Sequence, residues 1–331
     1  MRFIFGCTLL FFSLAAQAQG DIYDHEHRAY NRIKKYEDQI IASGAENSIN
    51  HGDAGANKCL PVYKDAIKNG VFDIRYALGY FDDSQGIDIL WNDKNWGLSP
   101  SLDIGVFNSI RRALTDRCPF NSTLSLCGFT ENGDASTGLV TLEKKIKLLG
   151  NSVLVKITLT QASASESFQD NKTILKGRQD FLTAQSEDNY FNGIGVADVV
   201  MYNGHSRNGG GPDFNPPVLM SNLHVNYNGY YRVKKTGITR LLNQIKNNPQ
   251  KDTILTFFSC FSKKHFYTDL LKANPNQKMV LSAEKIDYMD SIEASMGYLE
   301  GFLSGACGEE LTNIAKQGDR IKSGFQDFQI K

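Results

Sequence analysis

The sequence predicts an α/β fold, a mostly parallel sheet with helices on both faces, preceded by an N-terminal accessory region. From about residue 120 onward, apolar runs of strand length alternate with segments whose apolar residues recur every three or four positions. This alternation requires crossover connections, which join parallel strands. The chain has 331 residues, of which 41% are hydrophobic, enough for one large core or two smaller ones.

The first 18 residues have the pattern of a secretory signal. Arg2 precedes an apolar stretch at 3–14, and small residues at 16–18 form a cleavage site. A lipid anchor at Cys7 is the weaker alternative, because the apolar run continues past that cysteine. No later run approaches the ~20 apolar residues that span a bilayer. We therefore expect a secreted or periplasmic protein without an integral membrane segment once the signal is removed.

A surface helix is predicted within residues 20–50, where four apolar side chains recur at helical spacing. They are Tyr30, Ile33, Tyr36 and Ile40. Residues 71–76 and 86–91 alternate in the manner of strands, and the acidic segment 82–86 predicts the turn between them.

Strands and helices then alternate in order. The expected strands are 124–129, 153–159, 196–203, 253–258 and 279–281. The expected helices have apolar faces at Leu142, Ile146 and Leu149, at 238–245, at 267–271 and at 289–303. A polar segment, 163–180, separates the second strand from the third. The helix around Leu270 is expected to end before Asn274 and Pro275.

Charge and cysteine content narrow the function classes. Lys plus Arg and Asp plus Glu number 36 each, which removes the electrostatic argument for a nucleic-acid or acidic-membrane partner. Five cysteines remain after the signal, namely Cys59, Cys118, Cys127, Cys260 and Cys307. Because secreted thiols usually pair, an odd number predicts one free thiol. If Cys260 is free, the other four allow three connectivities, of which Cys118 with Cys127 is the most local; alternatively, Cys260 is an inert buried thiol.

Two residues follow directly on predicted strands. His205 comes after the run 199–204 and Cys260 after the run 253–259, 55 positions later. Function in parallel sheets collects at the carboxyl ends of the strands, so we expect the imidazole and the thiol to be neighbours if their strands are adjacent. They would then be a nucleophile and its base.

The residue types suit nucleophilic catalysis. A thiol attacks as the thiolate, and a free cysteine with a pKa near about 8.5 is mostly protonated at neutral pH. The helix expected after Cys260 and a protonated His205 would both favour the thiolate. The imidazole can return its proton to a leaving amine. The backbone N–H of Cys260 and a donor near Gly204 are candidates for the oxyanion hole, and no metal or organic cofactor is required.

These motifs resemble the caspase-hemoglobinase fold of cysteine peptidases, which includes caspases, legumains, clostripain and the gingipains. The resemblance covers roughly residues 120–310 as topology, and it rests on strands ending in Gly204-His205 and Ser259-Cys260, in that order. It implies a three-layer α/β/α catalytic domain over 117–331, with Cys260 as nucleophile and His205 as general base for peptide-bond hydrolysis through a thioester. Ser206 stands where the family usually has glycine, so the family's oxyanion donor is not carried over.

Residues 19–116 are then an N-terminal accessory region or a pro-region, and the sequence is equally compatible with their belonging to the catalytic unit. Glu131 and Asp134, after the strand 124–129, and Glu284, after the strand 279–281, could line a substrate pocket for Lys or Arg. Equally, they are ordinary solvated carboxylates. Asp213 could orient His205 or simply form a turn.

Two other function classes compete with the thiol peptidase. A serine hydrolase would use Ser206 in a nucleophile elbow, but Asn208 occupies the position where that turn needs glycine. The prolines that follow, beginning at Pro212, do not start a helix. The third class is a catalytically inactive caspase-like binding module.

Overall fold

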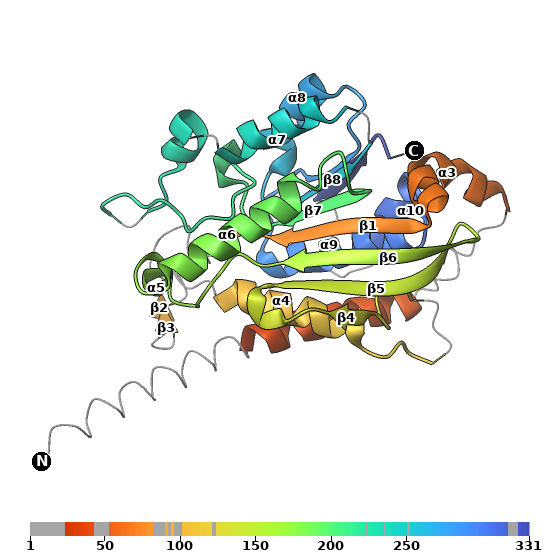
Figure 1. Ribbon diagram of the computed structural model, residues 1–331, viewed down its shortest axis with the longest axis horizontal. Helices are drawn as coiled ribbons and strands as arrows, with labels where there is room; N and C mark the ends of the chain where they lie inside the picture. Colours follow the sequence, from red (N-terminus) through yellow and green to blue (C-terminus); the bar gives the residue numbers. More distant parts are fainter. Residues whose placement is uncertain are drawn as a thin grey trace, which may run out of the picture.

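The computed structural model of the chain (Figure 1) describes residues 24–42, 53–81, 90–91, 94–95, 101–120, 124–222, 224–234, 236–249, 252–316 and 324–330. The expected signal peptide at 1–18 and the acidic turn at 82–86 lie outside these residues. No boundary between a signal and a mature chain is therefore assigned.

An eight-stranded sheet forms the centre of the molecule, with the order β10-β9-β8-β7-β1-β6-β5-β4. The strands are β1 (Val71–Leu78), β4 (Thr130–Asn132), β5 (Leu139–Leu148), β6 (Asn151–Thr160), β7 (Val199–Asn203), β8 (Ile254–Phe258), β9 (Met279–Ser282) and β10 (Phe325–Phe328). The inner strands from β6 to β9 pair in parallel, whereas β10, β5 and β4 add antiparallel edges. In chain order the parallel strands have the 2-1-3-4-5 arrangement of doubly wound sheets.

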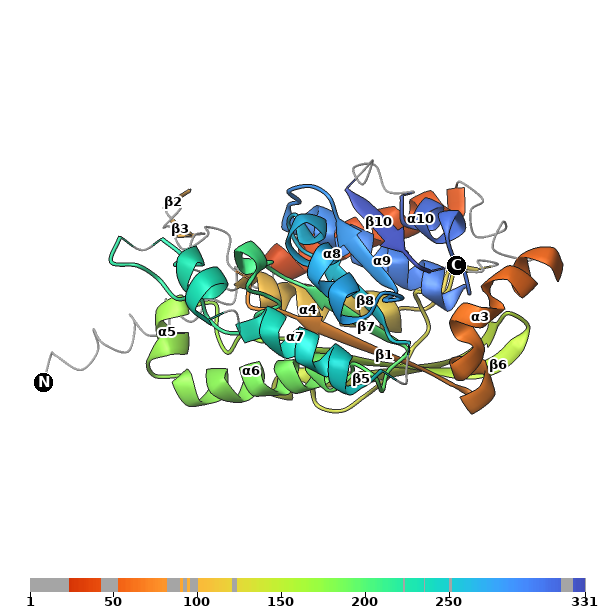
Figure 2. The same ribbon diagram turned by 90° about the horizontal axis from the view of Figure 1, so that it is seen from above.

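Helices cover both faces of this sheet. They are an N-terminal helix at 24–42, α3 (Asp53–Asn69), α4 (Ser101–Thr115), α5 (Phe168–Lys172), α6 (Lys176–Phe191), α7 (Thr236–Asn247), α8 (Ser262–Ala273), α9 (Tyr288–Leu303) and α10 (Glu309–Ala315). Figure 2 shows α6 and α7 on one side of the sheet and α4, α9 and α10 on the other. The predicted α/β class with a mostly parallel sheet is confirmed, and the layers are α/β/α.

Two hydrophobic cores result, one for each face. The larger joins the sheet to the helix at 24–42, α3, α4, α9 and α10, and the smaller joins it to α6, α7 and α8. Along β7, Val199 and Met201 belong to the first core, whereas Val200 and Tyr202 belong to the second. Because both faces are covered, β7 is a continuous apolar run from Val199 to Tyr202, whereas β1, also central, carries Asp73 and Arg75.

The helix expected at Leu142, Ile146 and Leu149 is strand β5 instead. Leu142 and Ile146 are four residues apart, which fits the two-residue period of a strand as well as the helical period, whereas Leu149 lies in the turn after the strand. The loop from β5 to β6 decides the structure: Leu149 and Gly150 have φ values of 48° and 81°. Positive φ at both central residues is the geometry of a tight two-residue hairpin.

The strand expected at 124–129 is wrong as well. This segment is a turn that the disulfide Cys118–Cys127 closes, and β4 begins only at Thr130. The polar segment 163–180 contains α5 and the start of α6.

The expected boundary between residues 116 and 117 cuts through a single sheet. Strand β1, from the region expected to be accessory, lies between β6 and β7 and pairs with both. The expected surface helix is also part of the core, because Ile33, Tyr36 and Ile40 are fully buried. The described residues before 117 therefore complete the α/β unit.

The cysteines agree with the parity argument. Cys59 in α3 bonds to Cys307 after α9, Cys118 bonds to Cys127, and Cys260 is free. Two disulfides fit the oxidising compartment that the leader predicts. None of the helices in the described part of the chain combines the length and apolar character that crossing a bilayer requires.

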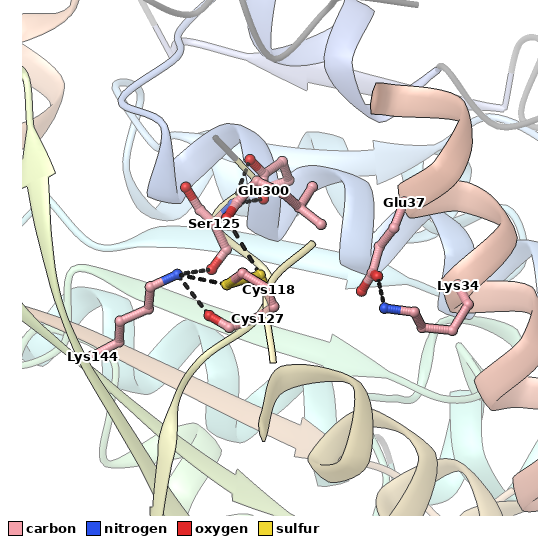
Figure 3. The surroundings of a disulfide bond; sticks show 8 residues. Lys34, Glu37, Cys118, Ser125, Cys127, Lys144 and Glu300 are labelled. Carbon is pink, nitrogen blue, oxygen red and sulfur yellow. Dashed lines mark hydrogen bonds and ion pairs between the residues drawn. A yellow bond between two sulfur atoms is a disulfide. The ribbon is translucent and has the colours of Figure 1, made fainter. Parts of the chain in front are cut away.

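A buried carboxylate lies beside the second disulfide (Figure 3). Both oxygens of Glu300 accept hydrogen bonds from the N–H of Ser125, at 3.0 and 2.9 Å. The Lys144 ammonium donates to the carbonyl oxygens of Ser125 and Cys127, at 3.0 and 2.6 Å. Burial, only partly offset by these contacts, raises the pKa of Glu300 to about 7.

Candidate active site

A cavity of about 210 Å³ opens at the carboxyl ends of four adjacent strands. Phe81 lines it after β1, residues 204–205 after β7, and residues 258–260 at the end of β8. The segment 285–291, which leads from β9 into α9, closes the remaining side. The cavity thus occupies the place where doubly wound sheets bind their ligands, next to the β1–β7 pair at which the strand order reverses.

His205 and Cys260 both line this cavity, as the topology argument predicts. The last registered pair of β7 and β8 is Asn203 with Phe258, and each site residue lies two positions beyond its member of that pair. Gly204 continues the ladder, since its N–H donates to the carbonyl oxygen of Phe258 at 3.4 Å. The strands end at Asn203 and Phe258, so the turns that follow bring His205 and Cys260 to the cavity, beside the sheet face that Asn203 and Phe258 share.

That face is covered by the first turn of α9. The Ser291 hydroxyl contacts the Asn203 side-chain oxygen at 2.6 Å and the Phe258 carbonyl oxygen at 2.8 Å. Asn203 is fully buried and also bonds to the hydroxyl of Tyr76. A buried polar network therefore holds the two strand ends and α9 together directly beneath the cavity.

His205 is held from two directions. The Phe81 ring meets the imidazole edge-on, with ring centroids 5.7 Å apart at an angle of 62°. The carbonyl oxygen of His205 accepts a hydrogen bond from the Tyr202 hydroxyl at 2.8 Å, and the same hydroxyl accepts from the N–H of Asp213 at 3.1 Å. Burial raises the pKa of Tyr202 far above its ordinary value, so the hydroxyl keeps its proton and remains a donor.

Cys260 lies in a sharp turn from strand to helix. Strand β8 ends at Phe258, and α8 starts at Ser262 after Phe261, whose φ and ψ are 51° and 29°. The thiol is therefore near the positive end of the α8 dipole. The Cys260 thiol donates to the carbonyl oxygen of Ile286 at 3.2 Å. Within the described residues, no backbone hydrogen bond uses the N–H of Cys260.

Gly204 does not supply an oxyanion donor, contrary to the prediction. Its N–H is engaged by the Phe258 carbonyl oxygen in the extension of the sheet. Glycine is needed here for a different reason: a Cβ at this position would lie 2.6 Å from the Tyr202 hydroxyl oxygen and 3.2 Å from the Gly79 Cα. Of the two predicted oxyanion donors, the N–H of Cys260 therefore remains the candidate.

Glu131 and Asp134 do not line the cavity. Glu131 is on β4, the edge strand four positions from β7, and its carboxylate pairs with Arg111 at 3.0 and 2.5 Å. Asp134 caps a short turn by accepting from the N–H of Ser136, and hydrogen bonds from the Ser136 side chain and N–H lower its pKa. The loop lies far along the sheet because β5 and β6 form a hairpin on the side opposite β8.

Glu284 contributes its backbone rather than its carboxylate. Its side chain is exposed and does not line the cavity, whereas its carbonyl oxygen accepts from the N–H of Phe261 at 2.8 Å. The acidic group at the cavity is Asp287, which the sequence argument missed. Asp287 is the N-cap of α9 and accepts from the N–H of Asp290, so an Asp-x-x-Asp pattern before an apolar helix was the available signal.

Asp213 forms a turn, as one of its two predictions has it, because its carboxylate accepts a hydrogen bond from the N–H of Asn215 at 3.2 Å. It forms an ion pair with Arg207 at 3.6 Å, and both side chains are almost completely buried. Arg207 also donates to the carbonyl oxygen of Tyr80 at 3.1 Å. A buried pair of this kind fixes the path of residues 206–213 after His205.

Ser206 is not in a nucleophile elbow. Its residue is 6% exposed and does not line the cavity, and its carbonyl oxygen accepts from the N–H groups of Gly209 and Gly211. Only a three-residue turn, Arg207–Gly209, follows it, where an elbow requires a helix.

The site thus combines a free thiol, an imidazole, an available backbone N–H and a helix terminus around one cavity, which is the set of groups that acyl transfer to sulfur requires. The Cys260 thiol and the His205 imidazole come from different loops at one sheet edge. No protein-family model, no curated protein and no solved structure matches this chain.

Proposed function

We propose that this chain is a secreted or periplasmic cysteine peptidase of the caspase-hemoglobinase type, with Cys260 as nucleophile and His205 as general base and acid. The observation that carries the proposal is the shared cavity at the carboxyl ends of β7 and β8. Its substrate is a polypeptide, and its chemistry needs no metal or organic cofactor.

The reaction begins with a proton transfer from the Cys260 sulfur to the His205 imidazole, which breaks the hydrogen bond to Ile286. The thiolate attacks the carbonyl carbon of the scissile bond, and the N–H of Cys260 donates to the oxyanion. The carbon–nitrogen bond then breaks as His205 returns its proton to the leaving amine. Water hydrolyses the thioester, releasing a carboxylic acid and restoring the thiol.

Three features support this chemistry over an inert thiol. Cys260 is half-buried and lines a cavity, whereas inert structural cysteines are enclosed by apolar side chains. The other four cysteines of the described chain are consumed in disulfides. The start of α8 lies two residues from the sulfur, where its dipole favours the thiolate.

The proposal is tested with two alkylating agents, a simple one and one that resembles a peptide substrate. Iodoacetamide and a peptidyl acyloxymethyl ketone should both modify Cys260, and modification should abolish cleavage of a mixed peptide library. Cys260→Ala should be inactive, whereas Ser206→Ala should cleave at the rate of the unaltered protein.

Two results would count against the proposal. Loss of activity in Ser206→Ala, with labelling of Ser206 by a fluorophosphonate, would favour a serine hydrolase. A folded protein whose thiol reacts no faster than glutathione and that cleaves no library peptide would favour a binding module.

A further inference from the structure

Phe261, which directly follows the proposed nucleophile, occupies a left-handed backbone conformation with φ of 51°. Residues with a Cβ rarely adopt this conformation, and Gly or Asn normally occupy it. Phe261 is nevertheless a large apolar residue that is 40% exposed, so its ring gains little from burial. A strained position with so little packing in return is a candidate for a functional side chain.

Two further aromatic residues are connected to this turn, His265 through the backbone of Phe261 and Tyr231 through its position beside His265 at Gly209. His265 is one helical turn further along α8, and its N–H donates to the carbonyl oxygen of Phe261 at 3.0 Å. The Tyr231 ring and the His265 Nδ1 lie 3.1 and 3.2 Å from the position that a Cβ would take on Gly209. Tyr231 is 45% exposed. We refer to Phe261, His265 and Tyr231 as the aromatic shelf.

The aromatic shelf disfavours a positive charge. Burial is the main cause that lowers the pKa of His265, and the nearby Lys264 lowers it further. Imidazole, phenyl and phenol rings in a site that disfavours charge are groups that accept apolar and aromatic side chains. The shelf lies outside the cavity, since none of its residues lines it, yet it adjoins Cys260 through the backbone of Phe261.

We propose that the aromatic shelf is a substrate subsite for an apolar side chain, adjacent to the residue that the cavity receives; this inference rests on the proposed function. Successive side chains of an extended peptide point in opposite directions. A peptide with one side chain in the cavity therefore directs its neighbour away from the cavity. Phe261, held beside the sulfur by its hydrogen bond to Glu284, is placed to meet that neighbour.

The first test uses alkylation of Cys260, which does not require peptide turnover. The probes are iodoacetamide and N-benzyl iodoacetamide, each normalised to its rate with glutathione; in both, the sulfur displaces iodide. We expect Cys260 of the unaltered protein to react about three- to tenfold faster with the benzyl probe than with iodoacetamide after normalisation, because the benzyl ring can stack on an aromatic surface. Phe261→Gly should abolish this preference and, by relieving the strained φ, should not lower the melting temperature.

Three control variants distinguish a subsite at Phe261 from a general change in the reactivity of the Cys260 thiol. Phe261→Asn also tolerates the left-handed conformation and should lose the preference, whereas Phe261→Leu should retain part of it. Phe120→Ala removes a phenylalanine that is 93% exposed elsewhere and should keep the full preference. An unchanged ratio in Phe261→Gly overturns the inference.

The second test is the cleavage profile of a mixed peptide library. The unaltered protein should prefer substrates with an apolar residue beside the residue whose side chain enters the cavity. Phe261→Gly should lose that preference while still cleaving peptides. Absence of all cleavage, with the probe preference intact, would refute the peptidase but keep the apolar subsite. Cleavage with an identical profile in both proteins would refute the subsite alone.

Discussion

His205 and Cys260 each lie two residues beyond the last registered pair of two adjacent parallel strands, Asn203 and Phe258. Neighbouring strands are about 4.8 Å apart. The equal offsets therefore place both residues in the turns directly after two adjacent strand ends, where both line one cavity whose other wall is the segment 285–291. This relationship is the basis of the predictions below.

Replacing the imidazole should affect catalysis without affecting folding. His205→Asn should lower kcat/KM for peptide cleavage about 10²- to 10⁴-fold, the usual contribution of a general base. Because His205 is only half-buried, the urea midpoint should change little. His224→Asn is the matched control, since His224 is exposed and lies outside the cavity. Equal losses in the two variants would contradict the assigned role.

Tyr202 should act as a positioning residue. Tyr202→Phe removes the donor to the His205 carbonyl oxygen and the acceptor for the Asp213 N–H, so it should destabilise the fold by about 1–3 kcal/mol and lower kcat more than it raises KM.

The control for this variant is Tyr36→Phe, which removes a buried hydrogen bond to the carbonyl oxygen of Ile314 in α10, at 2.8 Å, away from the loop that carries His205. It should cost similar stability and leave kcat unchanged. A parallel fall of kcat in both variants would mean that Tyr202 acts only through stability.

Stability should decrease as the pH rises from about 4.5 to about 7. Glu300 has its pKa raised from 4.5 to about 7 by burial, so in this range the folded protein retains a proton that the unfolded chain has released. Its contribution is fully present below the unfolded pKa and is lost as pH passes through the folded pKa. The loss from Glu300 is about 3 kcal/mol, because each pKa unit corresponds to about 1.4 kcal/mol.

Urea denaturation at pH 4.5 and pH 8 measures this effect. Glu300→Gln should remove the contribution of Glu300, and a comparable dependence should persist because burial also raises the pKa of Glu37 to about 7. Asp180→Asn, which removes an exposed carboxylate, should leave the pH dependence as it was. A pH-independent difference between Glu300→Gln and the unaltered protein would contradict the assignment.

The two disulfides should contribute unequally to stability. Cys59 and Cys307 are 248 positions apart, whereas Cys118 and Cys127 are nine apart. Loop-closure entropy gives about 5 kcal/mol for the long loop and about 3 kcal/mol for the short one. The double variants Cys59→Ala/Cys307→Ala and Cys118→Ala/Cys127→Ala should therefore differ in urea midpoint, and equal midpoints would show that loop length is not the controlling factor.

Several features of the fold could be predicted because they are encoded locally. The strands at β6, β7, β8 and β9 and the helices α7, α8 and α9 have unambiguous periods and end signals. Strand β5 was predicted as a helix from Leu142, Ile146 and Leu149, although its apolar residues Val140, Leu142, Ile146 and Leu148 follow the two-residue period of a strand. The hairpin signal at Leu149-Gly150 was the stronger evidence, because a positive φ at both positions forces the chain back on itself.

The sequence by itself determined the α/β class, one free thiol among the five cysteines after residue 18 and the positions of His205 and Cys260 after their strands, because periodicity, cysteine parity and residue order are properties of the chain. Only the tertiary structure decided that β1 inserts between β6 and β7, that Glu131 and Asp134 lie at the distant edge, and that Asp287 and Phe81 border the cavity. The order of strands in the sheet depends on how all the helices together bury their apolar faces. Because that requirement involves the whole molecule, no local pattern in the sequence reveals it.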